Sequence, residues 1–139
     1  MQKPNLISEQ DLSTIKIKLG KSKRSEKDWS VIKELIMAHD LIVPESIDED
    51  EYVRNIGGVM SVEGLMIAFS NPDDLSRLMD EFSKELQRTL RWKIKFLSFA
   101  DLGNIADQAG VMLCIDMFLD GKNRFISYHK GRVEATTLV

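Results

Sequence analysis

The sequence has one cysteine, two histidines and no apolar run approaching the ~18 residues of a transmembrane helix. A single cysteine excludes an internal disulfide, and Cys114 stands in the apolar run 111–115, so we expect it to be a small buried hydrophobe. A nucleophilic thiolate would need a nearby base, and no histidine is close in sequence. The N-terminus has no signal-peptide core, and no lipidation motif appears. These absences predict a cytoplasmic protein without a membrane partner.

Motifs for metal, cofactor or catalytic chemistry are also missing. Zinc sites need converging histidine, cysteine or carboxylate ligands, which two histidines and one cysteine do not supply. The acidic run 48–51 lacks the alternating ligands and central glycine of a calcium loop. Gly57-Gly58 has no phosphate-loop lysine after it, and no Gly-x-Ser-x-Gly elbow occurs. The sequence therefore predicts no metal, no cofactor and no enzyme activity.

The net charge of −3 disfavours nucleic acid as a partner, because such binding depends on neutralising phosphates. The charges are nevertheless distributed unevenly along the chain. A basic stretch contains Lys16, Lys18, Lys21, Lys23, Arg24 and Lys27. An acidic stretch contains Glu45, Asp48, Glu49, Asp50 and Glu51. Both are typical of solvated connecting surface, and the acidic residues are also our candidate contact for a protein partner, because charged patches steer encounters.

In the first third of the chain, the spacing predicts two helices and a short strand. Ser8 is placed to begin a helix that Gly20 ends, and residues 21–27 read as a flexible polar connector. A second helix starts at Ser25 or Asp28 and carries an apolar stripe. The run 41–43 then predicts a strand that ends at Pro44, since proline has no amide donor for a sheet.

The middle of the chain predicts a hairpin followed by the clearest helix. Residues 59–62 and 65–69 are mostly apolar and flank Glu63-Gly64, which is typical of a tight hairpin. Gly57-Gly58 indicates another turn. Ser70 or Asn71 can cap the next helix, Pro72 suits its first position, and its apolar residues recur at three- and four-residue spacing.

The last third predicts strands around a short helix. Residues 92–97 alternate apolar and basic side chains, so we expect a strand with its apolar face buried and its basic face in water. Ser98 begins a helix that Gly110 ends, and 111–118 reads as an interior strand. Asp120-Gly121 predicts a turn to a returning strand at 124–129; the tail beyond Gly131 has no clear pattern.

Together these elements predict an α+β fold, with a mixed β-sheet and helices packed on it, in one compact domain. With 139 residues, 43% of them apolar, the chain is long enough to bury a single core. We divide it into an N-terminal helix and basic connector at residues 1–27 and the α+β domain at 28–139.

Three segments carry a family resemblance: a helix and strand ending at Pro44, the junction 69–75 (Phe-Ser-Asn-Pro-Asp-Asp-Leu), and the junction 96–102 (Phe-Leu-Ser-Phe-Ala-Asp-Leu). Over residues 28–120 the chain resembles the SseB-like N-terminal domain, a bacterial α+β module. One departure is Ile115-Asp116-Met117, where that family often has an Ile-Asn-Pro-like triplet. The resemblance implies a poorly characterised protein with no established enzyme activity, and it transfers no functional residue.

The sequence leaves three functions open. The first is a non-enzymatic bacterial protein-interaction module that binds another protein through a sheet edge or its charged loops, with a homodimer possible. The second is a small acidic immunity or inhibitor protein that uses the 45–51 acidic run. The third is an enzyme whose site forms around Asp116, Tyr128 and His129.

Overall fold

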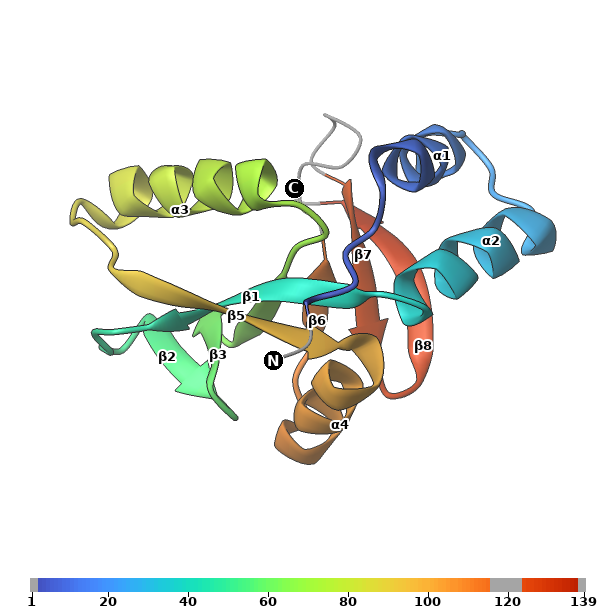
Figure 1. Ribbon diagram of the computed structural model, residues 1–139. Helices are drawn as coiled ribbons and strands as arrows, with labels where there is room; N and C mark the ends of the chain where they lie inside the picture. The colour runs from blue at the N-terminus through green and yellow to red at the C-terminus, as the bar shows by residue number, and fades with distance from the viewer. Residues whose placement is uncertain (1–2, 116–123, 138–139) are drawn as a thin grey trace.

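The computed structural model describes residues 3–115 and 124–137 and shows an α+β fold, as the sequence predicts (Figure 1). Within these residues the helices are α1 (Glu9–Leu19), α2 (Glu26–Met37), α3 (Pro72–Leu86) and α4 (Phe99–Ala109). The strands are β1 (Asp40–Ser46), β2 (Val53–Ile56), β3 (Val59–Val62), β4 (Leu65–Ala68), β5 (Trp92–Ser98), β6 (Leu113–Ile115), β7 (Arg124–His129) and β8 (Arg132–Thr137). The predicted turn at Asp120-Gly121 lies outside the described residues, as does the end of the predicted strand 111–118.

A mixed sheet has the strand order β2-β3-β4-β6-β7-β8, in which only β4 and β6 pair in parallel. Its tight turns join β2 to β3, β3 to β4, and β7 to β8. Each turn has two residues with positive φ, which matches the twist of the flanking strands. These residues are Gly57 and Gly58, Glu63 and Gly64, and Lys130 and Gly131. The hairpin at Glu63-Gly64 is therefore confirmed, whereas β2 and β8 are strands that the sequence analysis did not identify.

Both faces of this sheet are buried. Alternate strand residues such as Met66 and Ile115 contribute to one apolar cluster with residues of α1, α2 and α4. The intervening residues, such as Ile67 and Cys114, contribute to a second cluster with α3. The helices thus form layers on opposite sides of the sheet, with α3 apart from the other three (Figure 1).

The second sheet is the antiparallel pair β1-β5, and a backbone bridge links β1 to Phe69, the residue that follows β4. Ile42 and Phe69 exchange two backbone hydrogen bonds of 2.7 and 2.8 Å. The prediction that this strand ends at Pro44 is wrong, because β1 continues to Ser46. The backbone amide of Ile42 points toward Phe69 and away from β5, and position 44, two residues later, has the same orientation. Proline has no backbone N–H, but at position 44 this removes no hydrogen bond between β1 and β5.

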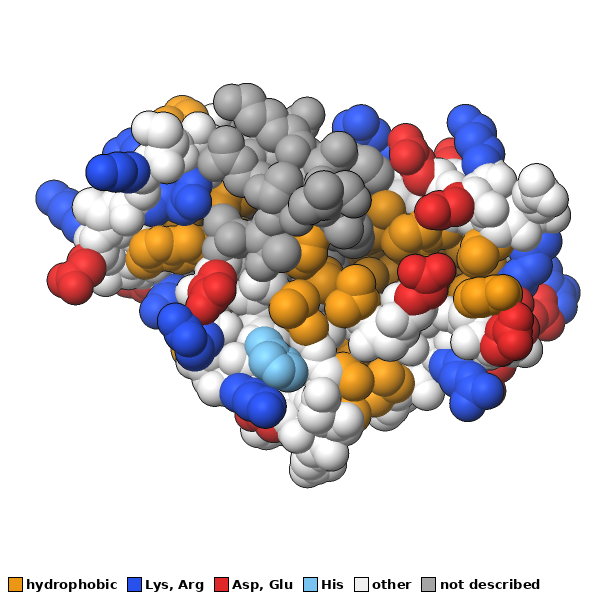
Figure 2. Space-filling model, turned by 180° about the vertical axis from the view of Figure 1, so that it is seen from behind, with side chains coloured by type: hydrophobic (Ala, Val, Ile, Leu, Met, Phe, Trp, Pro, Cys, Tyr) orange, Lys and Arg blue, Asp and Glu red, His pale blue; other side chains and the backbone are white. Residues whose placement is uncertain are grey.

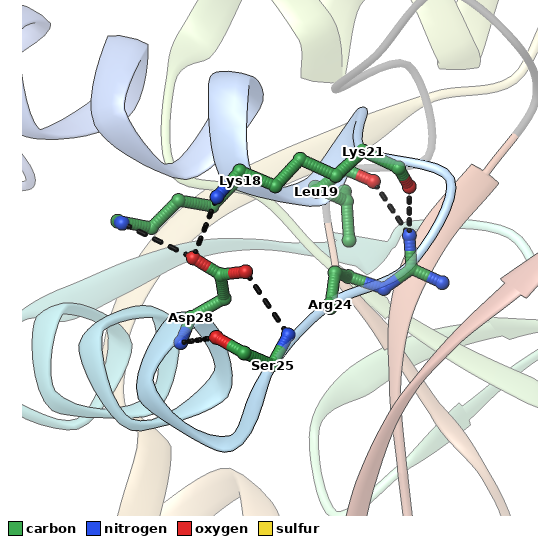
Figure 3. A network of polar contacts seen from close by, with 6 residues as sticks. All are labelled: Lys18, Leu19, Lys21, Arg24, Ser25 and Asp28. Atoms are coloured by element: carbon green, nitrogen blue, oxygen red, sulfur yellow. Dashed lines mark hydrogen bonds and ion pairs between the residues drawn. The ribbon is translucent and has the colours of Figure 1, made fainter.

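A buried carboxylate ties α1 to α2 (Figure 3). Asp28 Oδ1 lies 3.0 Å from Lys21 Nζ and 3.3 Å from Lys18 Nζ. Asp28 and Ser25 also accept hydrogen bonds from each other's backbone N–H, which makes a capping box. Arg24 Nη1 donates to the carbonyls of Leu19 and Lys21, so the connector predicted to be flexible is held in place. The pKa of Asp28 is lowered by Lys21 first, then by the Ser25 amide and Lys18.

We expect Asp28→Asn to flatten the loss of stability at acid pH. The pKa of Asp28 is lower in the fold than the value of about 4 in an unfolded chain, so its ionised form stabilises the fold above about pH 4. That contribution disappears as the pH falls below this value. Thermal unfolding from pH 7 to 2 should show a less stable variant at pH 7 and a steeper decline of Tm for the wild type. Glu26→Gln removes an exposed carboxylate from the same helical turn and is the control. Parallel wild-type and Asp28→Asn curves would contradict the prediction.

Candidate functional site

Strand β5 is an edge: within residues 3–115 and 124–137, β1 is the only strand that pairs with it. The amides of Asp40, Ile42 and Ser46 bind groups on the side of β1 away from β5. The intervening residues of β1 therefore bond to their register partners on β5, which are Lys93, Lys95 and Leu97. The backbone groups of Trp92, Ile94 and Phe96 consequently point outward from the free edge.

The outward-pointing residues also carry apolar side chains on one face of β5. Trp92 packs against the cluster that includes α3, but Ile94 and Phe96 are 49% and 43% exposed. The strand prediction is confirmed, whereas the prediction that all its apolar side chains are buried is wrong. The cluster with α3 includes Trp92 and Ile42 but not Ile94 or Phe96, so most of the apolar face of the edge strand lies beyond it.

The other face of β5 carries a row of cations in which Arg91 precedes Lys93 and Lys95. Arg91 forms a bidentate pair with Asp48, with both nitrogen–oxygen distances 2.8 Å. Glu45 lies 3.1 Å from Lys93 Nζ and 3.9 Å from Lys95 Nζ, and the hydrogen bond with Lys93 is the main cause of its lowered pKa. Three cations thus share two carboxylates, which leaves one excess positive charge on this face.

The acidic residues predicted to contact a partner are placed mostly against their own chain. Besides the pairs of Glu45 and Asp48, Asp50 Oδ2 lies 2.8 Å from Arg88 Nη2, and Asp50 Oδ1 accepts from the amides of Tyr52 and Val53 at 2.8 Å. Glu49 accepts from the amide of Asn55 at 2.8 Å. Glu51 is exposed, and no hydrogen bond or ion pair is found for it in the described part of the chain.

The ion pairs of Asp48 with Arg91 and of Asp50 with Arg88 hold the β1–β2 loop against the segment between α3 and β5. Because Asp50 binds two backbone amides and Arg88, a charge reversal there would disturb the loop as well as its surface. The role of the five acidic residues in partner binding stays a prediction, and Glu51→Lys is the substitution that tests it with the least effect on folding.

The predicted enzyme site is not assembled by the described residues. Tyr128 lines an open, largely apolar cavity of about 480 Å³ with Phe99, and it donates a 2.8 Å hydrogen bond to Asp107 that raises the pKa of the phenol. His129, the next residue on β7, lines a separate cavity of about 170 Å³ with Arg132. Consecutive strand residues face opposite sides, which separates the two side chains. Asp116 lies outside the described residues.

Cys114 is fully buried, as predicted, and burial raises the pKa of its thiol to about 12. Among the residues with a described placement, no three histidine, cysteine or acidic side chains are grouped to hold a metal ion. No helix in the same residues is long and apolar enough to cross a membrane. On the face opposite to that of Figure 1, hydrophobic side chains gather near the centre and charged side chains border them (Figure 2).

No family model, curated protein or solved structure matches this chain. The SseB-like resemblance therefore stays a prediction.

Proposed function

We propose that this chain is a non-enzymatic protein-interaction module, in which an extended segment of another protein pairs with the free edge of β5. One observation carries the proposal: Ile94 and Phe96 present outward backbone groups and exposed apolar side chains at the same positions. Main-chain hydrogen bonds at a sheet edge supply affinity, and alternate side chains supply specificity. The expected bacterial cytoplasmic setting and the SseB-like relationship are parts of the same proposal.

The features that usually protect an edge strand are weak in β5. Proteins commonly shorten edge strands, place lysines on them, add a bulge or proline, or cover them with a helix or loop. Strand β5 has seven residues, pairs with β1 in continuous register and contains no proline. Its lysines lie on the opposite face from Ile94 and Phe96, where Glu45 offsets part of their charge. An edge of this kind is suited to accept a further strand.

Ile94→Pro tests the proposal because it removes one outward N–H without removing a bond to β1. The chain already accommodates Pro44 directly opposite, in the same orientation. We expect the variant to keep the wild-type Tm within a few degrees and to lose the proteins that the wild type retains from an extract of its native cells. Ile94→Val keeps the amide and the branched side chain, and is the matched control.

Two results would contradict strand pairing at the β5 edge. Retention of the same proteins by wild type and Ile94→Pro would show that binding does not use the outward amide. Loss of those proteins by Ile94→Val as well would assign binding to the side chain alone and remove the argument for strand pairing.

A further inference from the structure

The two faces of β5 differ in chemistry, and the difference constrains any strand that pairs with it. One face presents the apolar side chains of Ile94 and Phe96. The other presents Lys93 and Lys95, of which Lys93 is 70% exposed. Because successive residues of a strand alternate between faces, an added strand places every second side chain beside the lysines and the others beside the apolar pair.

We infer that the partner segment alternates acidic and apolar residues, so that its carboxylates lie beside Lys93 and Lys95 and its apolar side chains beside Ile94 and Phe96. This inference rests on the proposed function and adds the chemistry of the occupant. Directly opposed charges of opposite sign stabilise a strand pair, and like charges destabilise it. Glu45 supplies one carboxylate for two lysines, with Lys95 Nζ at 3.9 Å, so this face retains positive charge for an incoming acidic side chain.

The same charges argue against a second copy of this chain as the occupant. Antiparallel self-pairing centred on Ile94 would place Lys93 of one copy opposite Lys95 of the other, twice across the interface. Each copy would bring one more cation than carboxylate to that face, counting Arg91 with Asp48 and the two lysines with Glu45. Charge therefore selects a different, acidic partner strand.

Binding of synthetic peptides to the full-length protein tests the inference. The probe is a fluorescent peptide of alternating glutamate and valine, and its counterpart replaces each glutamate with lysine. Fluorescence anisotropy at low salt should give a Kd about two- to thirtyfold lower for the acidic peptide, the range expected for two partly exposed ion pairs. Raising the salt to about 1 M should remove most of this preference, because salt screens exposed charges.

A charge-swapped variant reverses the expected preference while keeping the internal ion pairs. The triple variant Glu45→Lys, Lys93→Glu, Lys95→Glu places one lysine on β1 beside two glutamates on β5. The ion pairs between β1 and β5 are kept with their charges exchanged, and the excess charge on this face of β5 becomes negative. We expect this variant to prefer the basic peptide. Lys93→Gln, Lys95→Gln is a milder second variant for the case that the triple variant unfolds. It leaves Glu45 as the excess charge on this face, so it is expected to lose the preference for the acidic peptide.

The outcomes separate this inference from the proposed function. Preference for the acidic peptide, lost in Ile94→Pro and reversed in the charge-swapped variant, supports both. Equal binding of the two peptides, with loss in Ile94→Pro, overturns the charge inference and leaves edge pairing intact. Failure of the acidic peptide to bind wild type overturns the inference, while the extract experiment still tests whether partners pair with the β5 edge. A wild-type dimer in analytical ultracentrifugation that Ile94→Pro dissociates would overturn the acidic partner in favour of a second copy.

Discussion

Phe69→Ala is expected to lower the free energy of unfolding by about 3–5 kcal/mol, the usual cost of emptying a fully buried phenylalanine site. The Phe69 side chain is completely buried in the cluster that joins the six-stranded sheet to α3, together with Leu75 and Met79. Domains of this kind have a total stability of about 5–15 kcal/mol, so the loss is a large fraction of it. The backbone of residue 69 bonds to Ile42 whatever its side chain, so the loss reports packing rather than the bridge between the sheets.

Urea unfolding of wild type and variant measures this change. Phe96→Ala is the matched control, because it makes the same substitution at an exposed position of the β5 edge and should cost less than about 1 kcal/mol. Similar losses for both variants would mean that β5 is covered by its own chain. That result would also remove the basis for edge pairing.

The helices could be predicted because their signals are local. Ser25, Asn71 and Ser98 each accept a hydrogen bond from the backbone amide three residues ahead, and Pro72 occupies the first turn of α3. A cap and an apolar stripe depend on residues a few positions apart, so the sequence contains the necessary information. Pairing between distant strands is a different problem.

The strands that the sequence analysis missed depend on tertiary partners. Strand β2 has four residues, of which only Val53 is buried, and it follows a loop whose shape is set by Asp50 and Arg88. Strand β8 follows a turn whose first residue, Lys130, adopts positive φ without being glycine or asparagine. In both cases the neighbouring strand and the turn define the element, and the apolar pattern alone does not.

The candidate site could be predicted only in part for a related reason. The alternation in residues 92–97 predicts a strand correctly, but its period does not tell which face another element covers. The position of α3 decides that Trp92 is packed while Ile94 and Phe96 remain exposed. The acidic run was equally visible in the sequence, yet Arg88 and Arg91, about 40 residues away, bind two of its carboxylates. Such long-range pairs are not encoded in local spacing.

Gly57→Ala is expected to lower the free energy of unfolding by about 2–5 kcal/mol, because it combines left-handed backbone strain with overpacking. Gly57 has φ 58°, in the turn between β2 and β3. A Cβ atom there would lie 2.7 Å from Cγ2 of Ile105 on α4, closer than side chains approach without movement. The turn is therefore held against α4, and a methyl group would have to displace one of them.

Gly64→Ala provides the control for backbone strain, since Gly64 has φ 83° and its Cβ would meet no atom within 4 Å. The difference between the two variants in urea unfolding isolates the contact with Ile105. If that contact is responsible, Ile105→Ala makes room for the new methyl group, and the double variant should lose less stability than the sum of the single losses. Additive losses would show that the turn moves away from α4 freely. The turn belongs to the β2-β3 pair of the six-stranded sheet, and α4 continues directly from β5. The non-additive result would therefore show that the contact between Gly57 and Ile105 connects this sheet to the helix that follows the proposed binding edge.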